Sequence, residues 1–164
     1  MSHFEPQPGA RLLGRSLLVA APLALAACST GTREAALSPA AAVASGPTSL
    51  AREQLVGRWG VASFHNEKDR RRTEAQARAE CKSPYVIAKG PTDGVMMHVA
   101  DDPKLYELKL KGGAGGKTYL GFEAPPGAPD DREILSASSG LVLMRFVEPD
   151  VSRRYGTFVY ARCA

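Results

Sequence analysis

From Pro84 onward the chain consists of short apolar runs separated by turn residues, and this pattern restricts the fold more than any other feature. With the run that contains Trp59 there are eight such runs, at 57–64, 84–88, 95–100, 105–110, 117–122, 133–137, 141–147 and 155–163. Short runs at this spacing, bounded by Gly, Pro, Asp and Ser, predict the strands of a sandwich or barrel. Mostly tight, sequential connections favour an all-β fold, a small eight-stranded up-and-down antiparallel barrel, because closure removes the exposed strand edges.

Alternating apolar residues within these runs predict the barrel interior. We expect the interior to contain Val95, Met97, Val99, Leu108, Leu110, Leu120, Phe122, Met144, Phe146, Phe158 and Tyr160. Met96, Met97 and Met144 would give the walls adaptable side chains. A barrel of this size is either filled by its own side chains or holds one small ligand, and the sequence leaves both alternatives open.

The segment "NEKDRRRTEAQARAEC" (66–81) predicts one external α-helix. Asn66 is a suitable N-cap, and acidic residues in the first turn favour the positive end of the helix dipole. Ala75 and Ala79 form a thin apolar face, with Ala77 and Cys81 beside them, so we expect the helix to lie against the barrel surface. The basic cluster 68–72 is expected to be solvated, and contact with anionic headgroups is the alternative.

The first 27 residues are typical of an export signal. Arg11 and Arg15 precede an apolar run, residues 16–27, that is too short for a permanent membrane-spanning helix of about 20 residues. The tetrapeptide Leu25-Ala26-Ala27-Cys28 then resembles the lipobox of bacterial lipoproteins. This resemblance implies that the signal is removed and that Cys28 becomes an acylated N-terminus. An ordinary cleavable signal with an incidental cysteine is the alternative.

The lipoprotein resemblance also implies a location and a domain organisation. Ser29 is not the Asp that retains such proteins at the inner membrane, so we expect the periplasmic face of the outer membrane, reached through the lipid anchor. Residues 1–27 would be the signal peptide and 28–49 an Ala-, Ser-, Pro- and Gly-rich flexible tether. Residues 50–164 would form the barrel domain, preceded by a short helix in "SLAREQL" (49–55) that Ser49 would cap.

The three cysteines become an even set once Cys28 carries lipid. Cys81 and Cys163 then remain in an oxidising compartment, where they are a natural disulfide pair. Two buried free thiols are the alternative.

The tripeptide Gly57-Arg58-Trp59 resembles the Gly-x-Trp that opens the first strand of calycins, the superfamily of lipocalins, avidins and fatty-acid-binding proteins. The resemblance implies that an arginine of the last strand stacks on the tryptophan and closes one end of the barrel. Here that pair is Arg162 and Trp59, in a cation–π contact. Within calycins, "LVGRW" (55–59) and the domain size are most similar to a small bacterial inhibitor of secreted metalloproteases.

No motif assembles an active site or a metal centre. A phosphate-binding loop would need glycine where Lys111 stands, so "KGGAGGKTYL" (111–120) is expected to be a hairpin turn. His65, His98, Asp101 and Asp102 lack metal-ligand spacing. The serines lack a Gly-x-Ser-x-Gly elbow, and solvation in or beside a loop explains the carboxylates Asp130, Asp131 and Glu133.

These observations lead to a hypothesis about function. A net charge of +4 without a clustered basic face does not favour nucleic acid. We expect no enzyme and no cofactor, but a membrane-anchored binding or structural module for a small hydrophobic ligand or an envelope component. Inhibition of a periplasmic or secreted protease is the alternative, with residues 45–55 entering the protease cleft. An internal void above about 300 Å³ would favour a ligand, and an ordered, projecting segment before Leu55 would favour inhibition.

Overall fold

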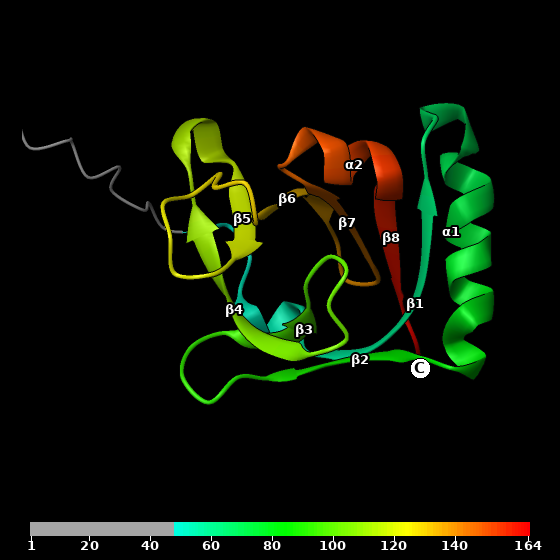
Figure 1. Ribbon diagram of the computed structural model, residues 1–164. Coiled ribbons are helices and arrows are strands. Elements are labelled where there is room, and N and C mark those ends of the chain that lie inside the picture. The colour runs from blue at the N-terminus through cyan, green and yellow to red at the C-terminus, as the bar shows by residue number, and fades with distance from the viewer. Residues whose placement is uncertain (1–47) are drawn as a thin grey trace, which may run out of the picture. The chain divides into compact units, whose positions relative to one another are not determined.

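A computed structural model describes residues 48–164 of the chain. The predicted signal peptide, Cys28 and the tether before Thr48 lie outside the described residues. Within residues 48–164, eight strands pair in chain order and the first pairs with the last, which closes an antiparallel barrel (Figure 1). The strands are β1 (Gly57–Phe64), β2 (Tyr85–Lys89), β3 (Val95–His98), β4 (Leu105–Gly112), β5 (Thr118–Gly121), β6 (Arg132–Ala137), β7 (Leu141–Phe146) and β8 (Thr157–Arg162). The predicted all-β barrel is confirmed.

The interior follows the predicted alternation. All eleven residues expected inside are buried or pack, partly buried, against buried neighbours. Trp59, Ile87 and Val142 also belong to this core, as do Leu50 and Leu55 from the segment before β1. Met96 is an exception among the methionines, because it alternates with the buried Met97 along β3 and points to the other face of the strand. The turn expected within 111–120 is the hairpin connection 113–117 from β4 to β5, because Lys111 and Gly112 still belong to β4.

One end of the barrel is closed by the chain that enters it. The 3₁₀ turn η1 (Arg52–Gln54) brings Leu50 and Leu55 into the core, and Trp59 donates its indole N–H to the Leu55 carbonyl at 2.8 Å. The Arg162 guanidinium lies 4.2 Å from the Trp59 ring centre. It also donates to the carbonyls of Gln54 (2.6 Å) and Val56 (3.1 Å), so it holds this segment in place.

Steric crowding at this closed end explains why glycine stands first in Gly57-Arg58-Trp59. A Cβ on Gly57 would stand 2.5 Å from the Nη1 atom of Arg162. Any larger residue at this position would therefore push the guanidinium off the Trp59 ring. The tripeptide and the arginine of β8 form one packing unit.

The predicted helix is present, but its buried face differs from the prediction. A 3₁₀ turn η2 (Glu67–Asp69), the helix α1 (Arg70–Ala79) and a second turn η3 (Glu80–Lys82) follow one another and pack against β1 and β8 (Figure 1). Asn66 makes no side-chain cap hydrogen bond. The buried residues of α1 are Thr73 and Ala77, whereas Ala75 and Ala79 are exposed. The predicted apolar face was therefore wrong by about half a turn.

A second helix was not predicted. The helix α2 (Pro149–Tyr155) connects β7 to β8, and the Glu148 side chain accepts a 2.7 Å hydrogen bond from the Val151 N–H at its start. Glutamate is not among the preferred N-cap residues, so no cap signal marks the start of this helix. The short helix expected at 49–55 is only the turn η1, which begins after Ala51 and not at Ser49.

A disulfide joins Cys81 in η3 to Cys163, the residue after β8, with Cα atoms 5.6 Å apart. It is the pair that the cysteine count selected. The bond ties the end of the external helical segment to the seam where β8 meets β1. The Cys163 N–H also donates to the Arg58 carbonyl at 2.9 Å, which extends that seam by one hydrogen bond.

The contact between α1 and β1 predicts the effect of Gly60→Ala. A Cβ at Gly60 would stand 1.8 Å from the Ala77 carbonyl oxygen, a backbone atom that cannot rotate away. We expect the substitution to push α1 off the sheet and to lower the free energy of unfolding by about 1–3 kcal/mol in urea titrations. Gly140→Ala is the matched control, because nothing lies within 4 Å of a Cβ there. Equal stability of the two variants would contradict the predicted close contact.

Candidate ligand-binding pocket

The barrel end opposite Trp59 contains a pocket of about 220 Å³. The strand registers place the β3–β4 loop (99–104) and the helix α2 at this end, because β3 and β7 both run toward it from the closed end. Both elements contribute to the pocket wall. The lining residues are Val61, Tyr85, His98, Val99, Ala100, Asp101, Arg132, Phe146, Tyr155, Phe158 and Tyr160.

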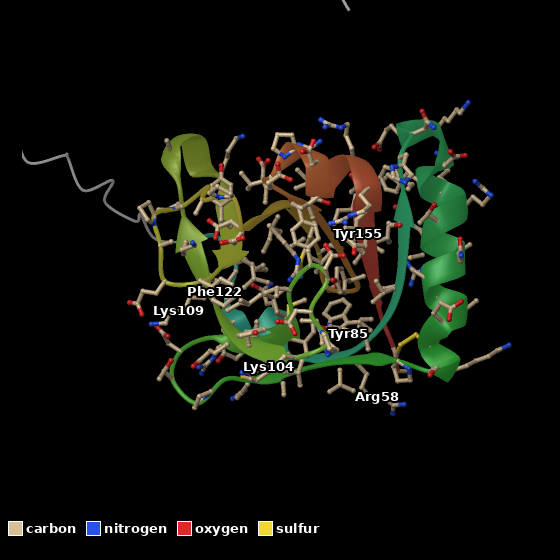
Figure 2. The ribbon with its side chains drawn as sticks, viewed as in Figure 1. Arg58, Tyr85, Lys104, Lys109, Phe122 and Tyr155 are labelled. Atoms are coloured by element: carbon tan, nitrogen blue, oxygen red, sulfur yellow. A yellow bond between two sulfur atoms is a disulfide. The ribbon has the colours of Figure 1, made fainter. Side chains whose placement is uncertain are left out.

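Aromatic rings form most of the wall. The rings of Phe146, Tyr155 and Phe158 lie 6.0 Å from one another, centre to centre, and Tyr160 lies 6.3 Å from Phe158. Figure 2 labels Tyr155, the last residue of α2, and Tyr85, the first residue of β2. These spacings are those of aromatic pairs in protein cores. The pocket therefore offers an apolar ligand flat, well-supported surfaces.

One buried cation interrupts this apolar wall. Arg132, the first residue of β6, is 5% exposed, and its guanidinium carbon lies 4.6 Å from the centre of the Phe146 ring. Its Nη2 donates to the His98 carbonyl, while Nε and Nη1 have no hydrogen-bond partner among residues 48–164. Arg132 takes part in none of the ion pairs found among residues 48–164.

The positive charge of Arg132 acts on two tyrosine hydroxyls of the pocket. Burial raises the pKa of Tyr85 and of Tyr160, and the positive charge of Arg132 opposes this shift in both. The hydroxyls are therefore neutral at physiological pH. The Tyr85 oxygen accepts from the His98 backbone N–H at 2.9 Å and lies 3.2 Å from its Nδ1 atom. Tyr160 makes no side-chain hydrogen bond with any residue of the described part.

Asp101 bridges the pocket mouth. Tyr155 donates its hydroxyl to one Asp101 carboxylate oxygen, and Arg154 donates to the other. The hydrogen bond that Tyr155 donates to Asp101 raises the pKa of the Tyr155 hydroxyl. Asp101 has a positive φ of 59°, a conformation that aspartate tolerates better than most residues. The bridge fixes the β3–β4 loop against α2, so both sides of the mouth are held at a defined separation.

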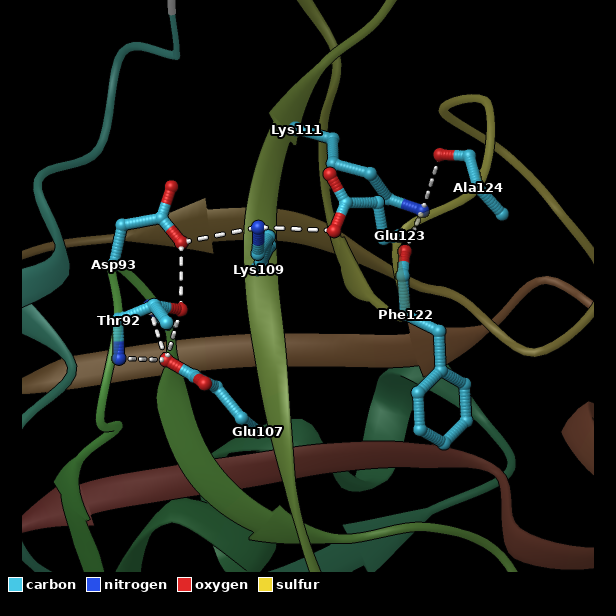
Figure 3. Close-up of polar contacts among 9 residues, drawn as sticks. Thr92, Asp93, Glu107, Lys109, Lys111, Phe122, Glu123 and Ala124 are labelled. Atoms are coloured by element: carbon cyan, nitrogen blue, oxygen red, sulfur yellow. Dashed lines mark hydrogen bonds and ion pairs between the residues drawn. The ribbon is translucent and has the colours of Figure 1, made fainter.

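A buried ion pair fixes the strand that carries Arg132. The Lys111 amine lies 2.6 Å from the Asp131 carboxylate, and both side chains are buried, at 7% and 1% exposure. Lys111 also donates to the carbonyls of Phe122 and Ala124, at 2.9 and 3.0 Å (Figure 3). Gly127 and Ala128 donate backbone N–H groups to the other Asp131 oxygen. The β5–β6 loop is thus pinned at the residue that precedes Arg132.

The sequence did not find Arg132, and it misjudged Asp131. We expected the carboxylates near this loop to be solvated, which is wrong for Asp131, because Lys111 and two backbone N–H groups satisfy it in the interior of the loop. The strand expected at 133–137 excludes Arg132, whereas β6 begins at this residue. The alternation of side chains along a strand is the signal that could have placed Arg132 on the inner face. Arg132 stands two residues before Ile134, whose side chain packs against the core.

The other residues considered from the sequence are dispersed. His98 and Asp101 belong to the pocket, whereas Asp102 accepts a hydrogen bond from the Tyr106 hydroxyl at 2.7 Å, and His65 borders a different surface depression. In residues 48–164 no three His, Cys, Asp or Glu side chains gather as a metal site. No helix in this range is long and apolar enough to cross a membrane.

Comparison with known proteins yields no relative. The chain matches no family model, and no curated protein or solved structure is significantly similar to it.

The unpaired guanidinium predicts an unusual stability effect for Arg132→Met. Methionine keeps an unbranched chain in the pocket wall and removes a buried charge with unsatisfied N–H groups. We expect the free energy of unfolding, measured by urea titration, to rise by about 1–3 kcal/mol. Arg145→Met removes an exposed arginine from the neighbouring strand and should change stability by about 0.5 kcal/mol or less. A loss of stability in Arg132→Met would mean that the guanidinium holds the barrel together.

Proposed function

We propose that this protein is a cell-envelope lipoprotein, anchored through Cys28, whose calycin-like barrel is a non-enzymatic binding module for a small hydrophobic ligand. The observation that carries the proposal is the aromatic pocket of about 220 Å³ at the open end of the barrel. Apolar concave sites with a few polar groups are the usual form of small-molecule sites. The packing of Arg162 on Trp59 at the opposite end supports a calycin-like arrangement.

The volume limits what the ligand is. Typical small-molecule sites start at about 300 Å³, and this pocket is smaller, so its volume does not meet the criterion set from the sequence for a ligand. The proposal rests on the aromatic lining and the buried cation of the pocket. Most of the barrel interior is filled by its own side chains. The ligand is therefore no larger than a single aromatic ring or a short acyl chain, or it leaves part of its length outside the mouth.

The N-terminal part of the barrel favours this function over protease inhibition. A segment that enters a protease cleft has to project from its domain. Leu50 and Leu55 are instead buried in the core, and Arg162 holds the backbone between them. Residues 48–55 are thus committed to closing the barrel.

Filling the pocket tests the binding function. Val61 lines the pocket from β1, so Val61→Phe would occupy the space that a ligand needs. We expect native mass spectrometry of protein purified from a bacterial envelope to detect a bound small molecule, with its occupancy reduced about tenfold in this variant. Val86→Phe, on the exposed side of β2, is the control and should retain the ligand. Equal occupancy in both variants would place the ligand elsewhere, and an empty wild-type protein would argue against the proposal.

The anchor is tested separately with Cys28→Ser. Oxygen is too poor a nucleophile to replace the thiol in thioether formation, so we expect the variant to incorporate no labelled palmitate and to leave the outer-membrane fraction. Membrane fractionation and intact-mass measurement of the wild-type chain provide the comparison. A wild-type mass without acyl groups, on a chain that still begins at Met1, would refute the anchor.

A further inference from the structure

We infer that the pocket selects a ligand that carries a carboxylate on its apolar body, and that Arg132 binds this carboxylate. The inference rests on the proposed binding function and specifies the class of ligand. It starts from the Nε and Nη1 atoms of Arg132, which together hold most of the N–H donors of the guanidinium and donate to nothing among residues 48–164. An arginine that stays charged inside a protein normally has an acidic partner.

Residues 48–164 supply no such partner. Asp131 is adjacent in sequence but is engaged by Lys111 and two backbone N–H groups. Glu133, the next residue along β6, pairs with Lys117 and Arg145. Asp101 belongs to the pocket mouth, where its two oxygens accept from Arg154 and Tyr155. These three carboxylates are thus committed to other groups, and the charge of Arg132 is left for a molecule that enters the pocket.

The other polar groups of the pocket suit an anion. The Tyr160 hydroxyl, which has no side-chain hydrogen bond within the described residues, and the Tyr85 hydroxyl lie in the same wall as Arg132. Both are neutral, so they donate to an anion without repelling it. The apolar remainder of the ligand would lie against Phe158 and Val61. A cationic ligand, in contrast, would meet the guanidinium without a counter-charge.

Reaching Arg132 requires a small rearrangement. Both unpartnered nitrogens are shielded from solvent, and the Phe146 ring covers one face of the guanidinium. A rotation of this ring, or of the arginine side chain, exposes the N–H groups to the pocket. Hydrogen bonds between a guanidinium and a carboxylate are among the strongest that proteins form, so the exchange is favourable.

A matched pair of probes tests the inference. Octanoate and 1-octanol are unbranched molecules with the same number of carbon atoms, and they differ in the charge of the head group. We would titrate both into the full chain carrying Cys28→Ser, so that no acyl group of the anchor competes for the pocket, and measure binding by calorimetry. We expect octanoate to bind at least about tenfold more tightly than 1-octanol.

Two arginine variants assign this preference to a residue. In Arg132→Met the affinity for octanoate should fall about tenfold or more, with 1-octanol changed by about twofold at most. Arg145→Met removes the same charge from the exposed side of β7 and should keep the wild-type preference. Arg132→Lys keeps the charge but loses the planar donor geometry, so it should retain only part of the preference.

The outcomes separate this inference from the proposed function. Equal affinity for octanoate and 1-octanol would overturn the carboxylate inference and leave a hydrophobic binding module. Failure of both probes to bind would overturn both. A preference for octanoate that survives in Arg132→Met would assign the anion to another residue. The comparison of the two probes on the unsubstituted pocket holds even if an Arg132 variant does not fold.

Discussion

The contact of Arg162 with Trp59 determines which end of the barrel is closed. The Arg162 guanidinium covers the indole ring of Trp59, and its hydrogen bonds to the carbonyls of Gln54 and Val56 hold it in this position. Trp59 in turn binds the Leu55 carbonyl. The entering chain is therefore built into the core at this end, and the space that remains inside lies at the other end, beneath α2.

Three long cationic side chains on the barrel strands differ in how well their N–H groups are satisfied. The Arg162 guanidinium is satisfied by an aromatic face and two carbonyls, and the Lys111 amine by a carboxylate and two carbonyls. Arg132 has one carbonyl and one aromatic face, and two of its nitrogens have no partner in the described part of the chain. Since burial without partners is costly, such a group is found mainly where function requires it. This contrast within one small domain is what distinguishes the pocket from ordinary core packing.

The sequence predicted the barrel well because period-two alternation and turn residues act locally. Val95 and Met97, for example, had only one face to which both could point. The pocket was not predictable in the same way. Arg132 follows two aspartates in a polar stretch, and composition alone suggests a solvated loop; only the distant Lys111, which buries Asp131, brings that stretch inside. The prediction of the buried face of α1 failed for a related reason. Because Gly60 has no side chain, the helix backbone at Ala77 approaches β1 closely. This contact buries Ala77 and leaves Ala75 and Ala79 exposed.

The pairing of β1 with β8 has a consequence for how the chain acquires its fold. A protein delivered N-terminus first, from a ribosome or a translocation channel, presents β1 long before the residues that complete its second edge. One edge of β1 stays unpaired until β8, which ends at Arg162, has emerged. Every intermediate chain length exposes this edge to unwanted strand addition. The external helical segment 67–82 follows β1 directly in the chain and covers it early. Because this segment packs on one face of β1, it shields that face during the interval, while the edge stays open until β8 pairs with it.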